Sequence, residues 1–325
     1  MTNSPGDRPS PLEAARPDGE ELLADLLQGT REAPYSLSPK YLYDQRGSEL
    51  FDRICELDAY YPTRTELAIL AARGREISAA VGPRALVVEL GSGSSNKTQA
   101  LLDHLEEPAA YVPVDISREH LEAAAARVDA AYPGLEVLPV AADYTRPYSL
   151  PTPRTEAART LLYFPGSTLG NFDLPEAEAF LARQAALAGS GGAMVVGLDL
   201  QKDVDVLLRA YDDPEGVTAA FNSNLLHRLR DELGADLDLD GFRHRARYNE
   251  DLGCVEMHLE SLKDQEIRVA GRAIPFRTGQ TIRTERSYKY TLAGFRDLAE
   301  RAGFRVARVW TDPDGYFSVQ FLEAV

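Results

Sequence analysis

The sequence predicts an α/β fold in which a Rossmann-like, doubly wound sheet is combined with a second α+β domain. Two sequence patterns in different parts of the chain support this prediction. Between residues 84 and 200, short apolar runs alternate with helical patterns, which is typical of a parallel sheet with right-handed crossovers. Between about 201 and 290 the alternation stops, and 242–290 has the pattern of antiparallel strands with turns at 250–253 and 270–271.

The elements can be assigned in order along the chain. Residues 1–20 are polar and contain several prolines, so we expect a mobile tail leading into a helix that begins near Glu20. The run ALVVEL at 85–90 is apolar and is ended sharply by GSGSSN, as in a buried parallel strand. Ser117 is the expected N-cap of the helix after the second strand. The other predicted strands are 110–115, 136–143, 160–166, 193–200, 304–312 and 316–325, and the predicted helices are 97–105, 117–132, 174–189, 216–234 and 292–304.

Composition excludes several classes of partner. The 325 residues include 35 Lys and Arg against 51 Asp and Glu, and the net charge of −16 argues against binding to a phosphate backbone. No apolar run reaches the roughly 18 residues that span a bilayer, and the N-terminus has no apolar signal segment. Cys55 and Cys254 match no short metal or redox spacing, and the five histidines form no metal-binding pattern. We therefore expect a cytoplasmic protein without metal, membrane or nucleic-acid partners. We also expect a monomer, although the composition does not determine the oligomeric state.

A glycine-containing turn after the first strand indicates a nucleotide-like ligand. Gly91 and Gly93 allow the backbone to approach a ligand closely, but the third glycine of a dinucleotide-binding loop is missing. Asp115 ends the next strand, where an acidic side chain can accept both ribose hydroxyls. Asp143 ends the third strand at the same sheet edge and suits an adenine amino group. The combination favours S-adenosylmethionine over NAD as the cofactor.

Seven separated motifs resemble one family, the L-histidine Nα-methyltransferases of ergothioneine biosynthesis. The resemblance runs from about Leu37 to the C-terminus. Its motifs are YLYDQRGSELFD, YYPTRTE, ELGSGSSNKT, FPGSTLGNF, RAYDDPEGVTAAFN, IRTERSYKY and WTDPDGYFSV. The resemblance implies that S-adenosylmethionine supplies three methyl groups to the α-amine of histidine, giving hercynine. It also implies a class I methyltransferase domain of residues 64–200 plus 289–325 and a substrate-binding domain of residues 21–63 plus 201–288.

The resemblance also implies which residues bind each ligand. The residues implied to bind the substrate carboxylate are Tyr60, Asn171 and Tyr211, and those implied to bind the imidazole are Glu285 and Ser287. Tyr43 is implied to lie near the reacting amine, where we expect it to act as the catalytic proton relay, and we place Met257 at the pocket floor. The implied cofactor contacts are Glu89, Gly91, Ser92, Gly93, Lys97, Asp115, Asp143 and Tyr144.

Several alternatives remain open from the residues alone. The tyrosines and Met257 could be ordinary core side chains, Asn171 a turn or capping residue, and Lys97 a solvated helix lysine. A relative that methylates another amino acid, such as tryptophan, would have the same overall pattern, and the effects of Arg286 and Tyr288 on the pocket are open. An NAD-linked oxidoreductase and a catalytically silent S-adenosylmethionine-binding protein are the alternatives of other classes.

Overall fold

The computed structural model describes residues 19–92 and 96–325. The expected tail, apart from its last two residues, and Gly93 lie outside the described residues. The main sheet has seven strands in the order β12–β13–β6–β5–β2–β3–β4. Their bounds are β2 Ala85–Leu90, β3 Ala110–Asp115, β4 Val140–Ala141, β5 Arg159–Phe164, β6 Ala193–Asp199, β12 Phe304–Thr311 and β13 Phe317–Ala324.

Five of these strands form the predicted parallel sheet, and the last two do not. Strands β4, β3, β2, β5 and β6 are parallel to their neighbours, whereas β13 pairs antiparallel with both β6 and β12. The difference follows from the link between β12 and β13, because the short turn at 312–315 can join only antiparallel strands. The Rossmann-like prediction is confirmed, with a mixed rather than wholly parallel sheet.

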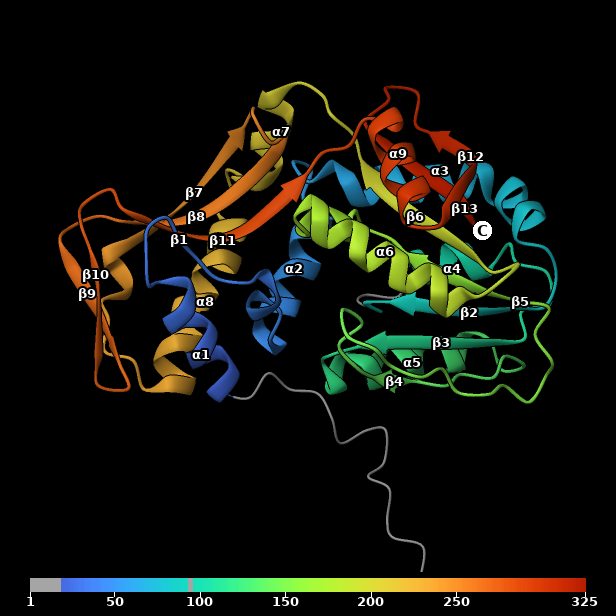
Figure 1. Ribbon diagram of the computed structural model, residues 1–325, viewed down its shortest axis with the longest axis horizontal. Helices are drawn as coiled ribbons and strands as arrows, with labels where there is room; N and C mark the ends of the chain where they lie inside the picture. Colours follow the sequence, from blue (N-terminus) through green and yellow to red (C-terminus); the bar gives the residue numbers. More distant parts are fainter. Residues whose placement is uncertain (1–18, 93–95) are drawn as a thin grey trace, which may run out of the picture.

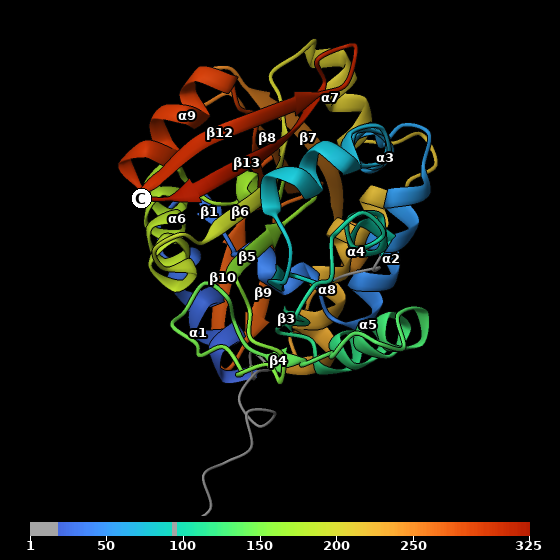
Figure 2. The same cartoon turned by 90° about the vertical axis from the view of Figure 1, so that its right-hand side faces the viewer.

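Helices cover both faces of the sheet, as Figure 2 shows. Helices α3 (Tyr61–Val81), α4 (Asn96–Leu102) and α5 (Arg118–Ala131) lie on one side, and α6 (Leu174–Ala188) and α9 (Leu292–Arg301) lie on the other. A separate apolar core fills each interface. Ser117 is at the N-cap of α5 as predicted, but its side chain makes no capping hydrogen bond.

The second body lies beside the sheet and joins the N-terminal segment to the chain between β6 and α9 (Figure 1). Its sheet has the order β1–β11–β8–β7, and β9 and β10 form a separate hairpin. The turns predicted at 250–253 and 270–271 join β7 to β8 and β9 to β10. The elements are α1 Gly19–Gly29, β1 Tyr35–Ser36, η2 Pro39–Leu42, α2 Gln45–Glu56, α7 Val204–Tyr211, α8 Val217–Leu233, η4 Leu239–Gly241, β7 Phe242–Asn249, β8 Cys254–Ser261, β9 Gln265–Val269, β10 Arg272–Phe276 and β11 Thr281–Tyr288.

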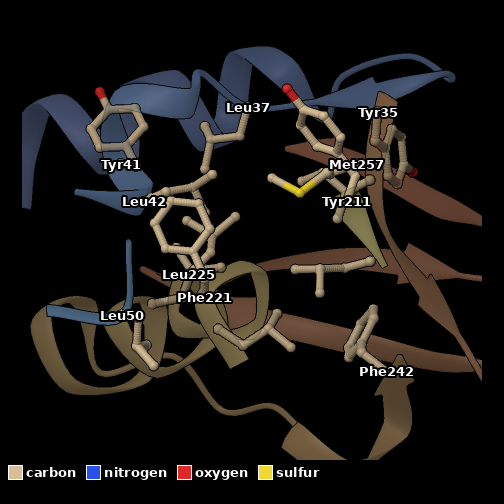
Figure 3. Packing of buried hydrophobic residues seen from close by; sticks show 14 of the residues in the cluster. Tyr35, Leu37, Tyr41, Leu42, Leu50, Tyr211, Phe221, Leu225, Phe242 and Met257 are labelled. Atoms are coloured by element: carbon tan, nitrogen blue, oxygen red, sulfur yellow. The ribbon is translucent and has the colours of Figure 1, made fainter. Parts of the chain in front are cut away.

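One apolar core holds the second body together. Its buried residues come from 22–61 and 207–282, two stretches far apart in the sequence. Figure 3 shows Phe221 and Leu225 of α8 packed beside Leu42 and Leu50 of the N-terminal segment. We propose on this basis that the two stretches form one domain, with the boundaries 21–63 plus 201–288. In the described part of the chain, no helix is both long and apolar enough to cross a membrane.

Candidate active site

A cavity of about 800 Å³ opens at the carboxyl ends of the parallel strands, where open α/β sheets bind their ligands. Residues of the second body, including Gln28 and the segment from Ser36 to Lys40, form its opposite wall. Seven predicted cofactor residues line the cavity, and Gly93 lies outside the described residues. The seven are Glu89, Gly91, Ser92, Lys97, Asp115, Asp143 and Tyr144.

The turn after β2 forms part of this cavity wall. Gly91 has φ 79°, a left-handed conformation that favours glycine, and its N–H donates to the Val114 carbonyl at 2.8 Å. The next side chain, Ser92, is buried, and its Oγ has no hydrogen-bond partner among the described residues. An unpaired buried hydroxyl in a cavity of this size fits a polar ligand seated against the turn. S-adenosylmethionine, with its amino-acid and ribose groups, is such a ligand.

Glu89 lines the cavity but is held by protein groups. Its carboxylate accepts hydrogen bonds from the Thr98 hydroxyl at 2.7 Å and from the Tyr111 hydroxyl. Burial raises the pKa of Glu89 to about 7, although both hydrogen bonds oppose the rise. The observed contacts of Glu89 therefore tie β2 to β3 and to the first turn of α4.

Lys97 is paired to a buried acid that the sequence analysis missed. Its Nζ lies 2.8 Å from the Glu66 carboxylate, and that carboxylate also accepts from the Gly166 N–H at 2.9 Å. Glu66 lies on the apolar face of α3, four residues after Pro62 and three before Ile69, and this spacing was the signal that could have found it. Glu66 thus joins α3, α4 and the loop after β5.

The two acids at the ends of β3 and β4 are oriented by their own loops. Asp115 Oδ1 accepts from the Ser117 N–H at 2.8 Å. Asp143 Oδ1 accepts from both the N–H and the hydroxyl of Thr145, at 2.9 and 2.5 Å. Both side chains line the large cavity, as the sequence predicts.

A second, smaller pocket lies between the sheet and the second body. The predicted catalytic and substrate residues all line it, although they come from distant stretches of chain. They are Tyr43, Tyr60, Asn171, Tyr211, Met257, Glu285 and Ser287. The two spaces meet at the residues that line both of them, which are Tyr43, Phe51, Gly166, Thr168, Asn171 and Glu285.

Glu285 contributes a buried carboxyl group to this pocket. It lies on β11, is 7% exposed, and has no hydrogen-bond or ion-pair partner among the described residues. Burial raises its pKa to about 7, and the nearby Lys289 opposes this rise. Met257 is its register partner on β8, and Ser287 follows two residues later on the same face of β11. An unpaired buried carboxylate is costly unless a ligand supplies the missing partner.

Aromatic rings line the same pocket as Glu285. The Tyr43 ring contacts those of Phe51 and Phe221 edge to face, with centroids 5.5 and 5.3 Å apart. The rings of Tyr60 and Tyr211 make a similar contact at 6.3 Å. Burial raises the pKa of the Tyr43 hydroxyl well above its ordinary value, so this group stays protonated at neutral pH.

The loop after β5 lies against β11 through a glycine. A Cβ at Gly170 would lie 2.8 Å from the Tyr288 carbonyl oxygen, so only glycine lets this loop bring Asn171 to the pocket. Arg286 and Tyr288 alternate with the pocket residues of β11, and Arg286 lines the large cavity. Both donate to Asp173, at 2.8 and 3.1 Å, and neither lines the smaller pocket.

A buried ionic cluster under the pocket was also missed from the sequence. Asp199, at the end of β6, pairs with Lys202 at 2.5 Å and with Lys289 at 2.8 Å, and it accepts from the Tyr61 hydroxyl at 2.8 Å. Asp199 ends a strand just as Asp115 does, and that position was its available signal. Lys289 follows β11 directly, and no spacing distinguished it from an ordinary surface lysine.

Comparison with known proteins gives one consistent family. The model of the family described as histidine-specific, SAM-dependent methyltransferases matches residues 22–324. Histidine N-alpha-methyltransferase of Mycolicibacterium smegmatis is 42% identical over 94% of this chain and 96% of its own length. The protein of the same name from Mycobacterium tuberculosis is 40% identical over 92% of this chain and 93% of its own length. Ergothioneine biosynthesis protein 1 of Neurospora crassa is 29% identical over 88% of this chain, which corresponds to 33% of that longer protein.

The family match spans nearly the whole chain, including both bodies and both cavities described above. The fold and these two bacterial relatives agree with it. The chain belongs to the family of histidine-specific, S-adenosylmethionine-dependent methyltransferases.

Proposed function

We propose that this methyltransferase adds methyl groups to the α-amine of L-histidine, three in succession, giving the trimethylated betaine hercynine for ergothioneine biosynthesis. The names of the two bacterial relatives support histidine Nα-methylation, and the name of the Neurospora crassa relative supports the pathway. S-adenosylmethionine supplies the methyl group from its sulfonium centre.

The observation that carries the proposal is the unpaired carboxylate of Glu285 in a pocket that opens onto the cofactor cavity. An imidazole N–H would give this carboxylate the hydrogen bond that the protein does not. The Ser287 hydroxyl lies two residues along the same strand face and is placed to contact the other ring nitrogen. An apolar amino acid would leave Glu285 unpaired, which is how a site of this kind rejects analogues.

The remaining pocket residues fit the amino-acid end of histidine. We assign the carboxylate to Tyr60, Asn171 and Tyr211, whose polar groups line the same pocket. We place the α-amine next to Tyr43, because Tyr43 lies where the pocket meets the large cavity. A methyl group then has a short path from one cavity to the other, which suits an in-line displacement.

The amine must lose a proton before each transfer. A free α-amine has a pKa of about 8, so most substrate arrives protonated at neutral pH. The protonated Tyr43 hydroxyl is not itself a base, and we assign it the role of ordering a water that takes this proton. The aromatic wall of Tyr43, Phe51 and Phe221 suits the fixed cation of the product, because ring faces attract quaternary ammonium groups.

The test is to incubate the protein with S-adenosylmethionine and a panel of L-amino acids that includes histidine and tryptophan. Mass spectrometry then counts the methyl groups on each. We expect histidine alone to be converted efficiently, with the trimethylated form as the final product. Methylated tryptophan in the absence of methylated histidine would instead assign the protein to a different substrate. Cofactor binding without product on any amino acid would indicate a catalytically silent protein.

A further inference from the structure

Lys289 is a buried cation whose donors are all used by the protein. Its side chain is 0% exposed. An ammonium group has three N–H donors, and the Nζ of Lys289 has three acceptors: Asp199 Oδ2 at 2.8 Å, Tyr211 Oη at 2.8 Å and Ser287 Oγ at 2.9 Å. Two of these acceptors line the substrate pocket, whereas Lys289 itself does not.

These contacts restrict the two pocket hydroxyls. Each hydroxyl oxygen has two lone pairs, and Lys289 occupies one on Tyr211 and one on Ser287. The Tyr211 hydroxyl donates to Ser287 Oγ at 2.8 Å, which fills the second lone pair of Ser287. The proton of Ser287 is then free only for the pocket. If a ligand carboxylate takes the Tyr211 proton instead, one lone pair of Ser287 is freed, and Lys289 still occupies the other one and one lone pair of Tyr211.

We propose that Lys289 is a positioning residue that turns Tyr211 and Ser287 into hydrogen-bond donors toward the substrate. The inference rests on the proposed function. We add that the histidine ring binds as a neutral imidazole. Its N–H donates to Glu285, and its unprotonated nitrogen accepts from Ser287. A ring with only an N–H, or with no nitrogen, cannot satisfy both groups.

The position of Lys289 is itself fixed by the junction between the two bodies. Asp199 ends β6, where the chain leaves the main sheet, and Lys289 follows β11, where the chain returns to it. The backbone links the same two segments, because the Tyr290 N–H donates to the Asp199 carbonyl and the Gln201 N–H donates to the Tyr290 carbonyl, both at 3.0 Å. The ammonium group therefore holds the pocket hydroxyls at a set place relative to the cofactor sheet.

A purely structural role would make Lys289 only a counter-ion for Asp199. Lys202 provides a matched comparison for that role, since its side chain is 5% exposed and its ammonium pairs with the same carboxylate at 2.5 Å. Lys202 donates to Asp199, to the Tyr61 hydroxyl and to the Leu200 carbonyl, and none of these contacts involves Tyr211 or Ser287. Replacing either lysine removes one ion pair to Asp199, but only Lys289 affects the pocket hydroxyls.

The test compares Lys289→Met with Lys202→Met on three substrates: L-histidine and the two alanines that carry a pyrrol-2-yl or pyrrol-3-yl ring. Each pyrrole replaces one imidazole nitrogen by CH and so lacks the acceptor nitrogen. We expect Lys289→Met to raise the histidine KM by about tenfold or more and to reduce the preference for histidine over both pyrroles by a similar factor. Lys202→Met should keep both values within about twofold of the wild type, because Lys202 shares Asp199 with Lys289 but contacts neither Tyr211 nor Ser287.

Calorimetric binding of S-adenosylmethionine monitors folding of each variant. If Lys289→Met does not fold, Lys289→Gln replaces it, since the shorter amide cannot reach all three acceptors and should show the same loss of preference. An unchanged histidine KM and an unchanged preference in a folded Lys289 variant would overturn the inference while leaving the proposed function intact. Absence of histidine methylation by the wild-type protein would overturn both.

Discussion

Replacing Glu285 by glutamine should stabilise the protein and weaken its activity at the same time. The carboxylate is 7% exposed and unpaired among the described residues, and burial raises its pKa from 4.5 to about 7. A pKa raised in the folded state means that folding favours the neutral acid. Wild-type stability contributed by this group is therefore complete below about pH 4.5 and is lost as pH rises through about 7.

The size of the effect follows from the difference between the two pKa values. At about 1.4 kcal/mol per pH unit, the ionised carboxylate lowers the free energy of unfolding by roughly 3 kcal/mol above neutral pH. The glutamine variant avoids this loss because its amide does not ionise. We expect the variant to be close to the wild type in stability at about pH 5 and more stable by up to roughly 3 kcal/mol at about pH 8.

The assay is urea-induced unfolding of the ligand-free proteins at both pH values. Glu89 is unchanged in both proteins, so its own raised pKa cancels in the comparison. Glu300→Gln on the exposed side of α9 is the matched control. It should leave the free energy of unfolding unchanged at both pH values. The histidine kcat/KM of Glu285→Gln should fall by about tenfold, because a hydrogen bond to a charged acceptor is replaced by one to a neutral amide. A glutamine variant that is no more stable than the wild type at the higher pH would refute the reasoning.

Three further changes test other parts of the site. Tyr43→Phe should lower kcat by about tenfold or more with little change in histidine KM, as removal of a proton relay does, and full turnover from acidic to alkaline pH would contradict that role. Gly170→Ala should lower the free energy of unfolding by about 1–3 kcal/mol and raise histidine KM, because its Cβ would lie 2.8 Å from the Tyr288 carbonyl oxygen and displace Asn171; unfolding curves and initial rates would detect both. Glu66→Gln should weaken S-adenosylmethionine binding in calorimetry, since the neutral amide no longer holds Lys97 by charge. Unchanged affinity would show that the ion pair does not shape the cofactor site.

The local periodicity of apolar residues predicted most of the fold. Apolar strands such as 85–90 and the helical spacing of α8 specify their elements locally, so the Rossmann-like sheet and the extra body were evident from the sequence. The strand directions were less evident, because pairing of β13 with β6 joins residues more than a hundred positions apart. The strand expected at 136–143 is interrupted: Val140–Ala141 form β4 beside β3, and Val137 makes a separate parallel bridge to Tyr111 of the same strand.

The site was predictable where a residue type itself indicates chemistry. The acids at strand ends could be picked out by type and position, whereas Glu285 and Ser287 were named from the family resemblance, because a solvated edge strand has the same spacing. The structure brings all of these residues to two adjoining cavities. The supporting residues could not be found in the same way. Lys289 resembles any surface lysine in sequence, and its importance depends on burial against Asp199 and on its contact with Tyr211 at the end of α7. Such long-range contacts leave no local pattern.

The most direct test of the central claim is to react L-histidine with S-adenosylmethionine carrying a ¹³C-labelled methyl group and to follow the products by NMR. The account predicts that all label appears on the α-nitrogen, first as the monomethyl and dimethyl forms and finally as the trimethylammonium group. Label on a ring nitrogen, or a reaction that ends before the third methyl, would contradict it.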